Sequence, residues 1–150
     1  MEYVDPQTAA RVWQRVQGTG VPESEVETLA RMSAMEAKDA GAYLQLSRRF
    51  RGKERTVLEQ LYRKKVASAS CLKGIYRLCS GKKPAAMPAL PVGVNTEAAL
   101  RQCYGREMQS LAAFTARTEH PEYGQVFARL ADQTRQRCQM LLMLVGNMGK

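Results

Sequence analysis

The chain has 150 residues with 45% hydrophobic residues, 25% charged residues and a net charge of +9, which is the size and composition of one folded domain. No apolar run approaches the ~20 residues of a membrane-spanning helix, and the N-terminus carries two acidic residues before any basic one, unlike a secretory signal. We therefore expect one cytoplasmic domain over residues 1–150, of all-α fold class because helix-forming residues dominate the composition.

The first elements are a short helix and a long one. Residues 1–20 are expected to form an N-terminal cap with a short helix over residues 7–17, which Gly18 ends. Pro22 and the glutamates that follow it then open a long helix, because proline and acidic side chains both favour a helix N-terminus. This helix is expected to run to about Arg49.

A second long helix and a long connection come next. A turn over residues 50–53 leads into a helix from about Glu54 to Ser80, and Gly81 is placed to cap its C-terminus. Residues 82–94 contain three prolines and a glycine and show no helical period. We interpret them as the one long crossover connection.

The remaining sequence predicts a second pair of helices. An Asn-Thr pair at residues 95–96 offers the cap for a helix that runs to about Thr118. A tight turn at His120 leads into the last helix, from about Pro121 to Gly146. Two short turns on either side of one long crossover predict a four-helix bundle made of two helical hairpins.

Each long helix carries a stripe of core residues at alternating spacings of three and four. The first and third stripes superpose at a constant offset of 71 residues, and the second and fourth at an offset of 69. These offsets predict a duplicated hairpin whose two copies differ in loop length. In chain order the stripes are Leu29, Ser33, Glu36, Ala40, Tyr43, Ser47 and Phe50; Leu58, Leu61, Lys65, Ser68, Leu72, Ile75 and Cys79; Leu100, Tyr104, Glu107, Leu111, Phe114 and Thr118; and Phe127, Leu130, Thr134, Arg137, Leu141, Leu144 and Met148.

Polar residues interrupt every stripe near its middle. Charged groups inside a bundle are unfavourable unless they are paired or bind a metal. Their coincidence at one level of four helices therefore predicts a shared, buried polar layer. The layer consists of Glu36, Lys65, Ser68, Glu107, Thr134 and Arg137.

These patterns resemble the ferritin-like superfamily, most closely its rubrerythrin-type members. The matching features are Glu36 followed seven residues later by Tyr43, and Glu107 followed seven residues later by Phe114. The LxxLxxxKxxSxxxLxxIY and FxxLxxxTxxRxxxL stretches of the second and fourth helices also match. The resemblance covers about residues 22–148 and implies a ferritin-like four-helix bundle, here with a long crossover and an extra N-terminal helix.

In such proteins a di-metal site takes one Glu from each of two helices and a Glu-x-x-His pair from each of the other two. The resemblance places the two single carboxylates at Glu36 and Glu107, which are therefore retained ligand positions.

The paired ligands of the family are missing. The first pair falls on Lys65 and Ser68, and the second on Thr134 and Arg137. Two carboxylates cannot supply the coordination that two iron or manganese ions need. The sequence therefore predicts no metal, no cofactor and no catalytic residue, and the loss of the family's redox activity.

A salt-bridge hypothesis follows from this loss. Lys65 and Arg137 are expected to pair with Glu36 and Glu107 inside the bundle, in place of the cations of a metalloprotein. The alternative is that Lys65 or Arg137 extends to the surface and the carboxylates are hydrated.

Other polar side chains near the layer form an unfamiliar ligand set that contains no histidine. Cys103 and Gln133 belong to this set, and we expect Asp39 and Asp132 to be solvated charges on helix faces. The single histidine, His120, is expected to be exposed at its turn, with a structural role.

The sulfur-containing residues are interpreted as packing residues. No two cysteines form a CxxC pair, which excludes a zinc knuckle, and thiols in a cytosolic protein are expected to be reduced and buried. Methionines at helical spacing are expected to fill the core or a dimer seam. The residues concerned are Cys71, Cys79, Cys103 and Cys138, and Met32, Met35, Met140 and Met143.

The net charge is concentrated in one hairpin. Between Arg48 and Lys83 twelve basic residues face only Glu54 and Glu59, an excess that accounts for the whole net charge. This stretch is either a solvated face or a surface for an acidic partner.

Three functions are compatible with these patterns. The first is a binding or structural module, expected to be a homodimer, that has lost di-metal chemistry. The second is an oxidoreductase with an altered iron or manganese site at Glu36 and Glu107. The third is a binder of nucleic acid or acidic protein through the basic second helix, although no nucleic-acid-binding motif is present.

Overall fold

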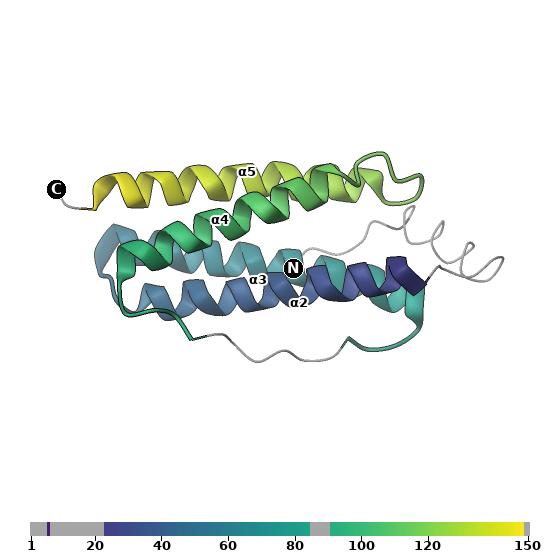
Figure 1. Ribbon diagram of the computed structural model, residues 1–150, viewed down its shortest axis with the longest axis horizontal. Coiled ribbons are helices and arrows are strands. Elements are labelled where there is room, and N and C mark those ends of the chain that lie inside the picture. Colours follow the sequence, from purple (N-terminus) through teal and green to yellow (C-terminus); the bar gives the residue numbers. More distant parts are fainter. Residues whose placement is uncertain (1–5, 7–22, 85–90, 149–150) are drawn as a thin grey trace.

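In the computed structural model, the described residues are Pro6, 23–84 and 91–148, and their secondary structure is helical (Figure 1). The helices are α2 (Glu23–Ser47), α3 (Gly52–Ser80), α4 (Thr96–Thr115) and α5 (Gly124–Asn147). The expected N-terminal helix over residues 7–17 and the middle of the 82–94 crossover lie outside the described residues. The all-α, four-helix prediction is confirmed for the rest of the chain.

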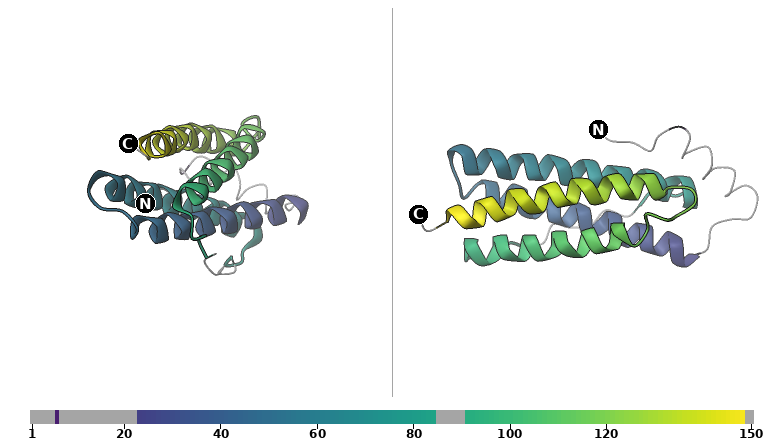
Figure 2. Two further views of the ribbon diagram at one scale, coloured as in Figure 1. Left: turned by 60° about the vertical axis from the view of Figure 1, so that its left-hand side comes forward. Right: turned by 90° about the horizontal axis from the view of Figure 1, so that it is seen from above.

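The helices form two antiparallel hairpins that pack on each other. α2 packs along α3, and α4 packs along α5, while α2 with α4 and α3 with α5 make the contacts between the hairpins. Figures 1 and 2 show that α3 and α4 run in the same direction, so the end of α3 and the start of α4 lie at opposite ends of the bundle. Neighbouring helices are therefore antiparallel all round the bundle.

The helix ends follow local chemistry. Gly81 has a φ of 70° and donates its N–H to the Arg77 carbonyl at 2.8 Å, which confirms the predicted C-cap. Asn95 caps α4, because its side chain accepts a hydrogen bond of 2.9 Å from the Ala98 N–H.

The helix boundaries at the α4–α5 turn differ from the prediction. α4 ends at Thr115 rather than at Thr118, and α5 begins at Gly124 rather than at Pro121. The chain folds back so tightly here that a Cβ atom on Gly124 would lie 2.3 Å from the Thr118 carbonyl oxygen. The glycine is therefore required by this close approach, which a helical pattern does not reveal.

The hydrophobic core has two halves, and all four helices contribute to each. Leu29, Leu72 and Phe127 lie in one half, and Leu46 and Leu141 lie in the other. The predicted stripes are buried apart from a few partly exposed positions near their ends and on α4. These positions are Phe50, Tyr104, Leu111, Thr118 and Met148.

The sulfur-containing side chains are distributed between core and surface. All four cysteines are reduced and buried, as expected. Met32 is buried, but Met35 is 36% exposed and Met143 is 70% exposed. Met143 is therefore not a core residue of the single chain, which leaves the dimer seam as the expectation for it. No helix among residues 23–84 and 91–148 has both the length and the hydropathy needed to cross a bilayer.

Candidate functional site: a buried ion network

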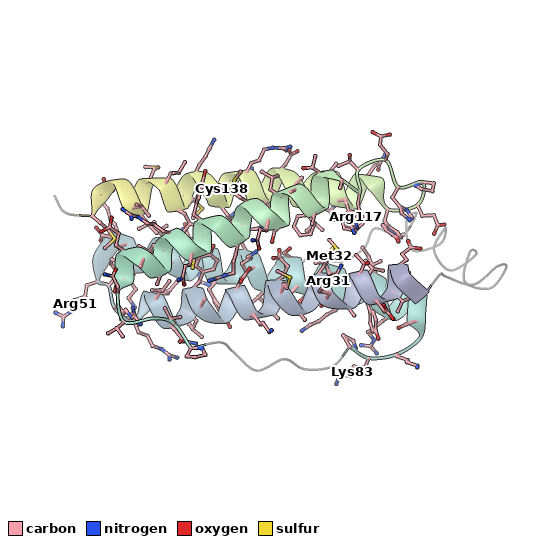
Figure 3. All side chains as sticks on the ribbon, in the orientation of Figure 1. Arg31, Met32, Arg51, Lys83, Arg117 and Cys138 are labelled. Carbon is pink, nitrogen blue, oxygen red and sulfur yellow. The ribbon has the colours of Figure 1, made fainter. Side chains whose placement is uncertain are left out.

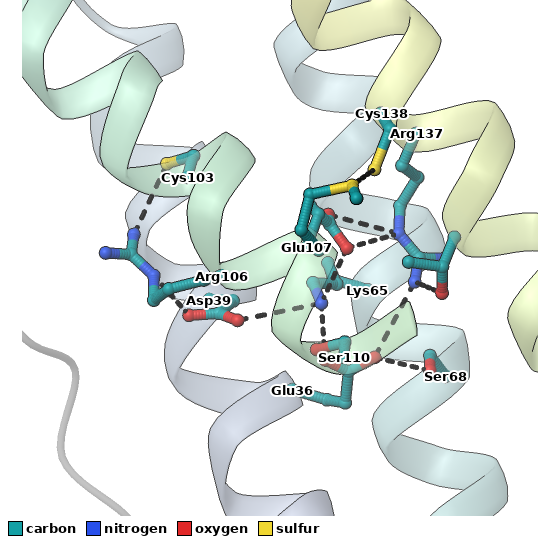
Figure 4. A network of polar contacts seen from close by, with 12 residues as sticks. Glu36, Asp39, Lys65, Ser68, Cys103, Arg106, Glu107, Ser110, Arg137 and Cys138 are labelled. Atoms are coloured by element: carbon teal, nitrogen blue, oxygen red, sulfur yellow. Dashed lines mark hydrogen bonds and ion pairs between the residues drawn. The ribbon is translucent and has the colours of Figure 1, made fainter. Parts of the chain in front are cut away.

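The six residues of the predicted polar layer meet at one level of the bundle, between the two halves of the hydrophobic core (Figure 4). Each residue is at most 1% exposed. They come from all four helices, because the duplicated stripes place their polar interruptions opposite one another. The six are Glu36, Lys65, Ser68, Glu107, Thr134 and Arg137.

Lys65 on α3 lies between three carboxylates. Its Nζ makes a short ion pair with Glu36 Oε2 and lies 3.0 Å from Glu107 Oε1. Asp39 Oδ2 lies 3.6 Å from the same nitrogen. The ammonium group therefore bridges acidic residues of α2 and α4.

Arg137 on α5 completes the pairing on the other side. Its Nε donates to both oxygens of Glu107, at 3.1 and 3.2 Å, and its Nη2 donates to Thr134 Oγ1 at 2.7 Å. The same Nη2 lies 3.6 Å from Glu36 Oε1. The salt bridges expected from the sequence are thus present, and neither cation reaches the surface.

Hydroxyl groups occupy the remaining acceptor positions of the two glutamates. Tyr43 donates to Glu107 Oε2 at 2.6 Å. Ser68 donates to Glu36 Oε1 at 2.8 Å, and Ser110 donates to Glu36 Oε2 at 3.2 Å. Each carboxylate therefore receives hydrogen bonds as well as a counter-charge, which a buried anion requires.

Asp39 belongs to this network, so the expectation that it is solvated is wrong. It is 6% exposed, and its Oδ1 accepts a hydrogen bond of 2.8 Å from Arg106 Nε. Arg106 in turn donates to Cys103 Sγ at 3.3 Å. Asp39 follows Glu36 by three residues and so lies on the same helix face, a signal that was available in the sequence. No such pattern indicates the contact of Arg106 with Asp39, because the core stripe of α4 contains Glu107 and not Arg106.

The network is electrically balanced. It contains three carboxylates and three permanent cations, which are Glu36, Asp39 and Glu107, and Lys65, Arg106 and Arg137. This balance accounts for the presence of so many charges at the centre of a small bundle.

The pKa shifts report the same competition between burial and charge pairing. Burial raises the pKa of Asp39, and its two cationic neighbours offset this only in part. Burial opposes the charge of Lys65, but Glu36 and Glu107 outweigh it and raise the pKa of the lysine. Burial also opposes the charge of Glu107, and here Lys65 and Arg137 prevail and lower the pKa.

The donor set of this layer does not suit a metal ion. An ammonium or guanidinium group has no lone pair to offer a cation, and Lys65 and Arg137 are in contact with the very carboxylates that would coordinate one. In the part of the chain that the structure describes, no three His, Cys, Asp or Glu side chains are grouped as metal ligands. Of the other residues considered, Asp132 is exposed and pairs with Arg135 at 2.6 Å.

His120 is less exposed than expected and is joined to α2. Its side chain is 19% exposed, and its Nε2 lies 2.8 Å from Glu25 Oε1. Its Nδ1 accepts hydrogen bonds from the backbone N–H groups of Glu122 and Tyr123, at 3.1 and 3.4 Å. Because both ring nitrogens are engaged, the imidazole serves to fix the α4–α5 turn against α2 and offers no lone pair for general-base catalysis.

Comparisons with protein-family models, with curated proteins and with solved structures found no match to this chain. Over residues 23–84 and 91–148, the class that the structure defines is a helical bundle of two hairpins with an ion network buried at its centre.

Proposed function

We propose that this protein is a ferritin-like bundle of the rubrerythrin type that has lost its di-metal site and acts as a binding or structural module. The arrangement of two antiparallel hairpins joined by one long connection supports the assignment, because ferritin-like bundles have this topology. The constant offsets between the stripes support it as well.

A single observation carries the proposed loss of metal chemistry. Lys65 Nζ is in contact with both Glu36 and Glu107, the two positions that match the single carboxylate ligands of the family. A positive charge is thus supplied by the protein at the place where a metalloprotein supplies it with cations. The guanidinium group of Arg137 repeats the arrangement from the opposite helix.

The network then has a structural role. Each cation joins carboxylates of two other helices, so the four helices are tied together at one level and in one register. Buried ion pairs often contribute little net stability, but a wrong register would leave charges unpaired in the core.

The proposal is tested by metal content. The untagged protein is purified without chelators, challenged with Fe(II) and Mn(II), and measured by elemental mass spectrometry. We expect far less than one metal ion per chain before and after the challenge. About two ions per chain, the content of an intact di-metal site, would overturn the proposal.

A matched variant makes the test decisive. The four substitutions Lys65→Glu, Ser68→His, Thr134→Glu and Arg137→His restore the ligand pattern of the family at the positions that match it. We expect this variant to bind about two metal ions per chain. If the restored variant folds and binds none, the ferritin-like assignment of these positions is wrong.

The basic surface supports a second candidate function, binding of an acidic partner. Of the twelve basic residues between Arg48 and Lys83, all except Lys65 are exposed. Figure 3 shows Arg51 and Lys83 projecting from opposite ends of the α2–α3 hairpin. Binding to immobilised bulk duplex DNA that weakens steeply as the salt concentration rises would support this function. The absence of binding to both DNA and polyglutamate would contradict it.

A homodimer remains our proposal for the oligomeric state. Large apolar side chains are exposed on the second hairpin at Met108, Leu142 and Met143, which are 43%, 54% and 70% exposed. Such residues are more readily covered by a partner than left in water. Sedimentation equilibrium of the wild type and of a Met143→Lys variant would test this, since a dimer that buries Met143 should be weakened by the charge.

A further inference from the structure

A second polar feature lies beside the ion network. A pocket of about 270 Å³ is formed between α2, α4 and the segment that leads into α4. Its polar lining is contributed by Lys38 and Asp39 from α2, and by Gln102, Cys103 and Arg106 from α4. Its volume is close to the lower end of the range for small-molecule sites.

The pocket has one positive charge in excess. Asp39 is neutralised by Lys65 and Arg106, as described above. Lys38 is only partly exposed, and within the described residues it makes no ion pair or hydrogen bond. Arg106 uses Nε and Nη2 for Asp39 and Cys103, and Figure 4 shows its third nitrogen, Nη1, without a contact to the residues drawn. The Lys38 ammonium group and the remaining Arg106 nitrogen, both from residues that line one pocket, are donors of the kind that an anion requires.

The rest of the lining is apolar and held in place. Ala42, Val92 and Ala99 contribute side chains without polar atoms. The position of Val92 is fixed by α2 and the turn that follows it, because Gln45 Oε1 accepts its N–H at 3.2 Å and Arg49 Nη2 donates to its carbonyl at 3.4 Å. Because this wall is already in place, little conformational entropy of the protein is lost when a ligand binds against it.

The neighbouring thiol does not oppose an anion. Burial raises the pKa of Cys103 to about 11, so the sulfur carries no charge at neutral pH. The positive charge of the pocket is therefore not cancelled from within.

We propose that this pocket binds a small organic carboxylate. Its carboxylate group pairs with Lys38 and Arg106, and its short alkyl part lies against Ala42, Val92 and Ala99. The site goes beyond the proposed loss of metal chemistry and does not depend on it, because Lys38 and the apolar wall lie outside the ion network.

Butyrate is the probe, and isothermal titration calorimetry on the full-length protein is the measurement. We expect saturable binding with a Kd of the order of 1 mM, and none for 1-butanol, which has the same alkyl chain without the charge. Lys38→Gln should weaken butyrate binding by about tenfold or more, and Lys38→Arg should retain it. Lys64→Gln, which removes an exposed lysine of α3, is the matched control and should bind like the wild type.

A second variant tests the pocket without touching its charges. Ala99→Leu places additional carbon atoms against the apolar wall and should abolish butyrate binding while Lys38 and Arg106 remain. Butyrate binding that is unaffected by both Lys38→Gln and Ala99→Leu would overturn the proposal, as would the absence of saturable binding to the wild type. Inorganic phosphate that competes as well as butyrate would overturn the assignment to an organic acid, because the apolar wall would then contribute nothing.

Discussion

The hydroxyl group of Tyr43 on α2 donates a hydrogen bond of 2.6 Å to Glu107 on α4. The duplicated pattern relates Tyr43 to Phe114 and Glu107 to Glu36, so the symmetric bond between Phe114 and Glu36 does not exist. Glu36 instead accepts hydrogen bonds from two serine hydroxyls. The two hairpins thus satisfy equivalent buried carboxylates by different donors.

This asymmetry predicts the effect of Tyr43→Phe, which copies the residue of the other hairpin into this one. The variant removes one hydrogen bond to a buried charge and leaves the ring packing unchanged. We expect the free energy of unfolding in urea to fall by about 1.5–3 kcal/mol. Tyr104→Phe, at a partly exposed tyrosine of α4, is the control and should change stability by less than about 0.5 kcal/mol. Equal effects of the two variants would show that the Tyr43 hydroxyl contributes nothing particular.

The pairing of Lys65 predicts a non-additive double mutant. Lys65→Met leaves Glu36 without its closest counter-charge and should destabilise the protein by about 3–5 kcal/mol. Adding Glu36→Gln removes the unpaired charge, so the double variant should be more stable than Lys65→Met alone. Lys64→Met, at the exposed neighbouring position, should have little effect. A double variant no more stable than Lys65→Met would refute the pairing.

Stability in acid depends on two carboxyl groups whose pKa values are shifted in opposite directions by folding. The pKa of Glu107 is lowered in the folded state from its usual value of 4.5, so its contribution is present above that pH and is lost as the pH falls through the lowered value. The pKa of Asp39 is raised from 3.8, so acidification through the raised value gives stability back. Asp39→Asn removes the second contribution.

We therefore expect Asp39→Asn to lose more stability than the wild type between neutral pH and about pH 4, measured as the difference between two urea unfolding curves for each protein. Because each protein is compared with itself at two pH values, the stability that the variant loses at every pH, through its missing ion pairs with Arg106 and Lys65, cancels. A smaller acid loss in the variant than in the wild type would show that the pKa of Asp39 is not raised.

Helical periodicity was sufficient to locate the polar layer. Glu36, Lys65, Glu107 and Arg137 stand at core positions of stripes that superpose, and a charge at a core position must face the core whichever partner it has. The same reasoning separated the two hairpins, because only residues 82–94 lack a helical period.

Other contacts are harder to predict from periodicity. The burial of Asp39 follows only from a wider apolar face than the narrow stripe through Glu36 and Ala40, because Asp39 lies one turn after Glu36 on the same side of the helix. The contact of His120 with Glu25 joins residues 95 positions apart, and no periodicity relates them. The boundaries near Thr118 were missed for a third reason, since the close approach at the turn depends on backbone geometry.

Alkaline pH should destabilise the protein through buried groups that retain their protons in the folded state, among them Cys103, Lys65 and Tyr43. The Cys103 thiol has its pKa raised from 9.0 to about 11, so between these values the unfolded chain loses a proton that the folded chain keeps. Lys65 and Tyr43 act in the same direction at higher pH, because the pKa of each is also raised in the folded state. The free energy of unfolding should therefore fall as the pH rises above about 9.

The Cys103→Ser variant isolates the first of these contributions. A hydroxyl does not ionise in this range and can still accept the hydrogen bond from Arg106, so the variant should lose less stability than the wild type between pH 9.0 and about 11. The difference should be at most about 2–3 kcal/mol, which corresponds to the two pH units separating the folded and unfolded pKa values. Parallel stability curves for the two proteins over this range would mean that the Cys103 thiol ionises as readily in the folded chain as in the unfolded one, and that the interior around Arg106 is more hydrated than the structure indicates.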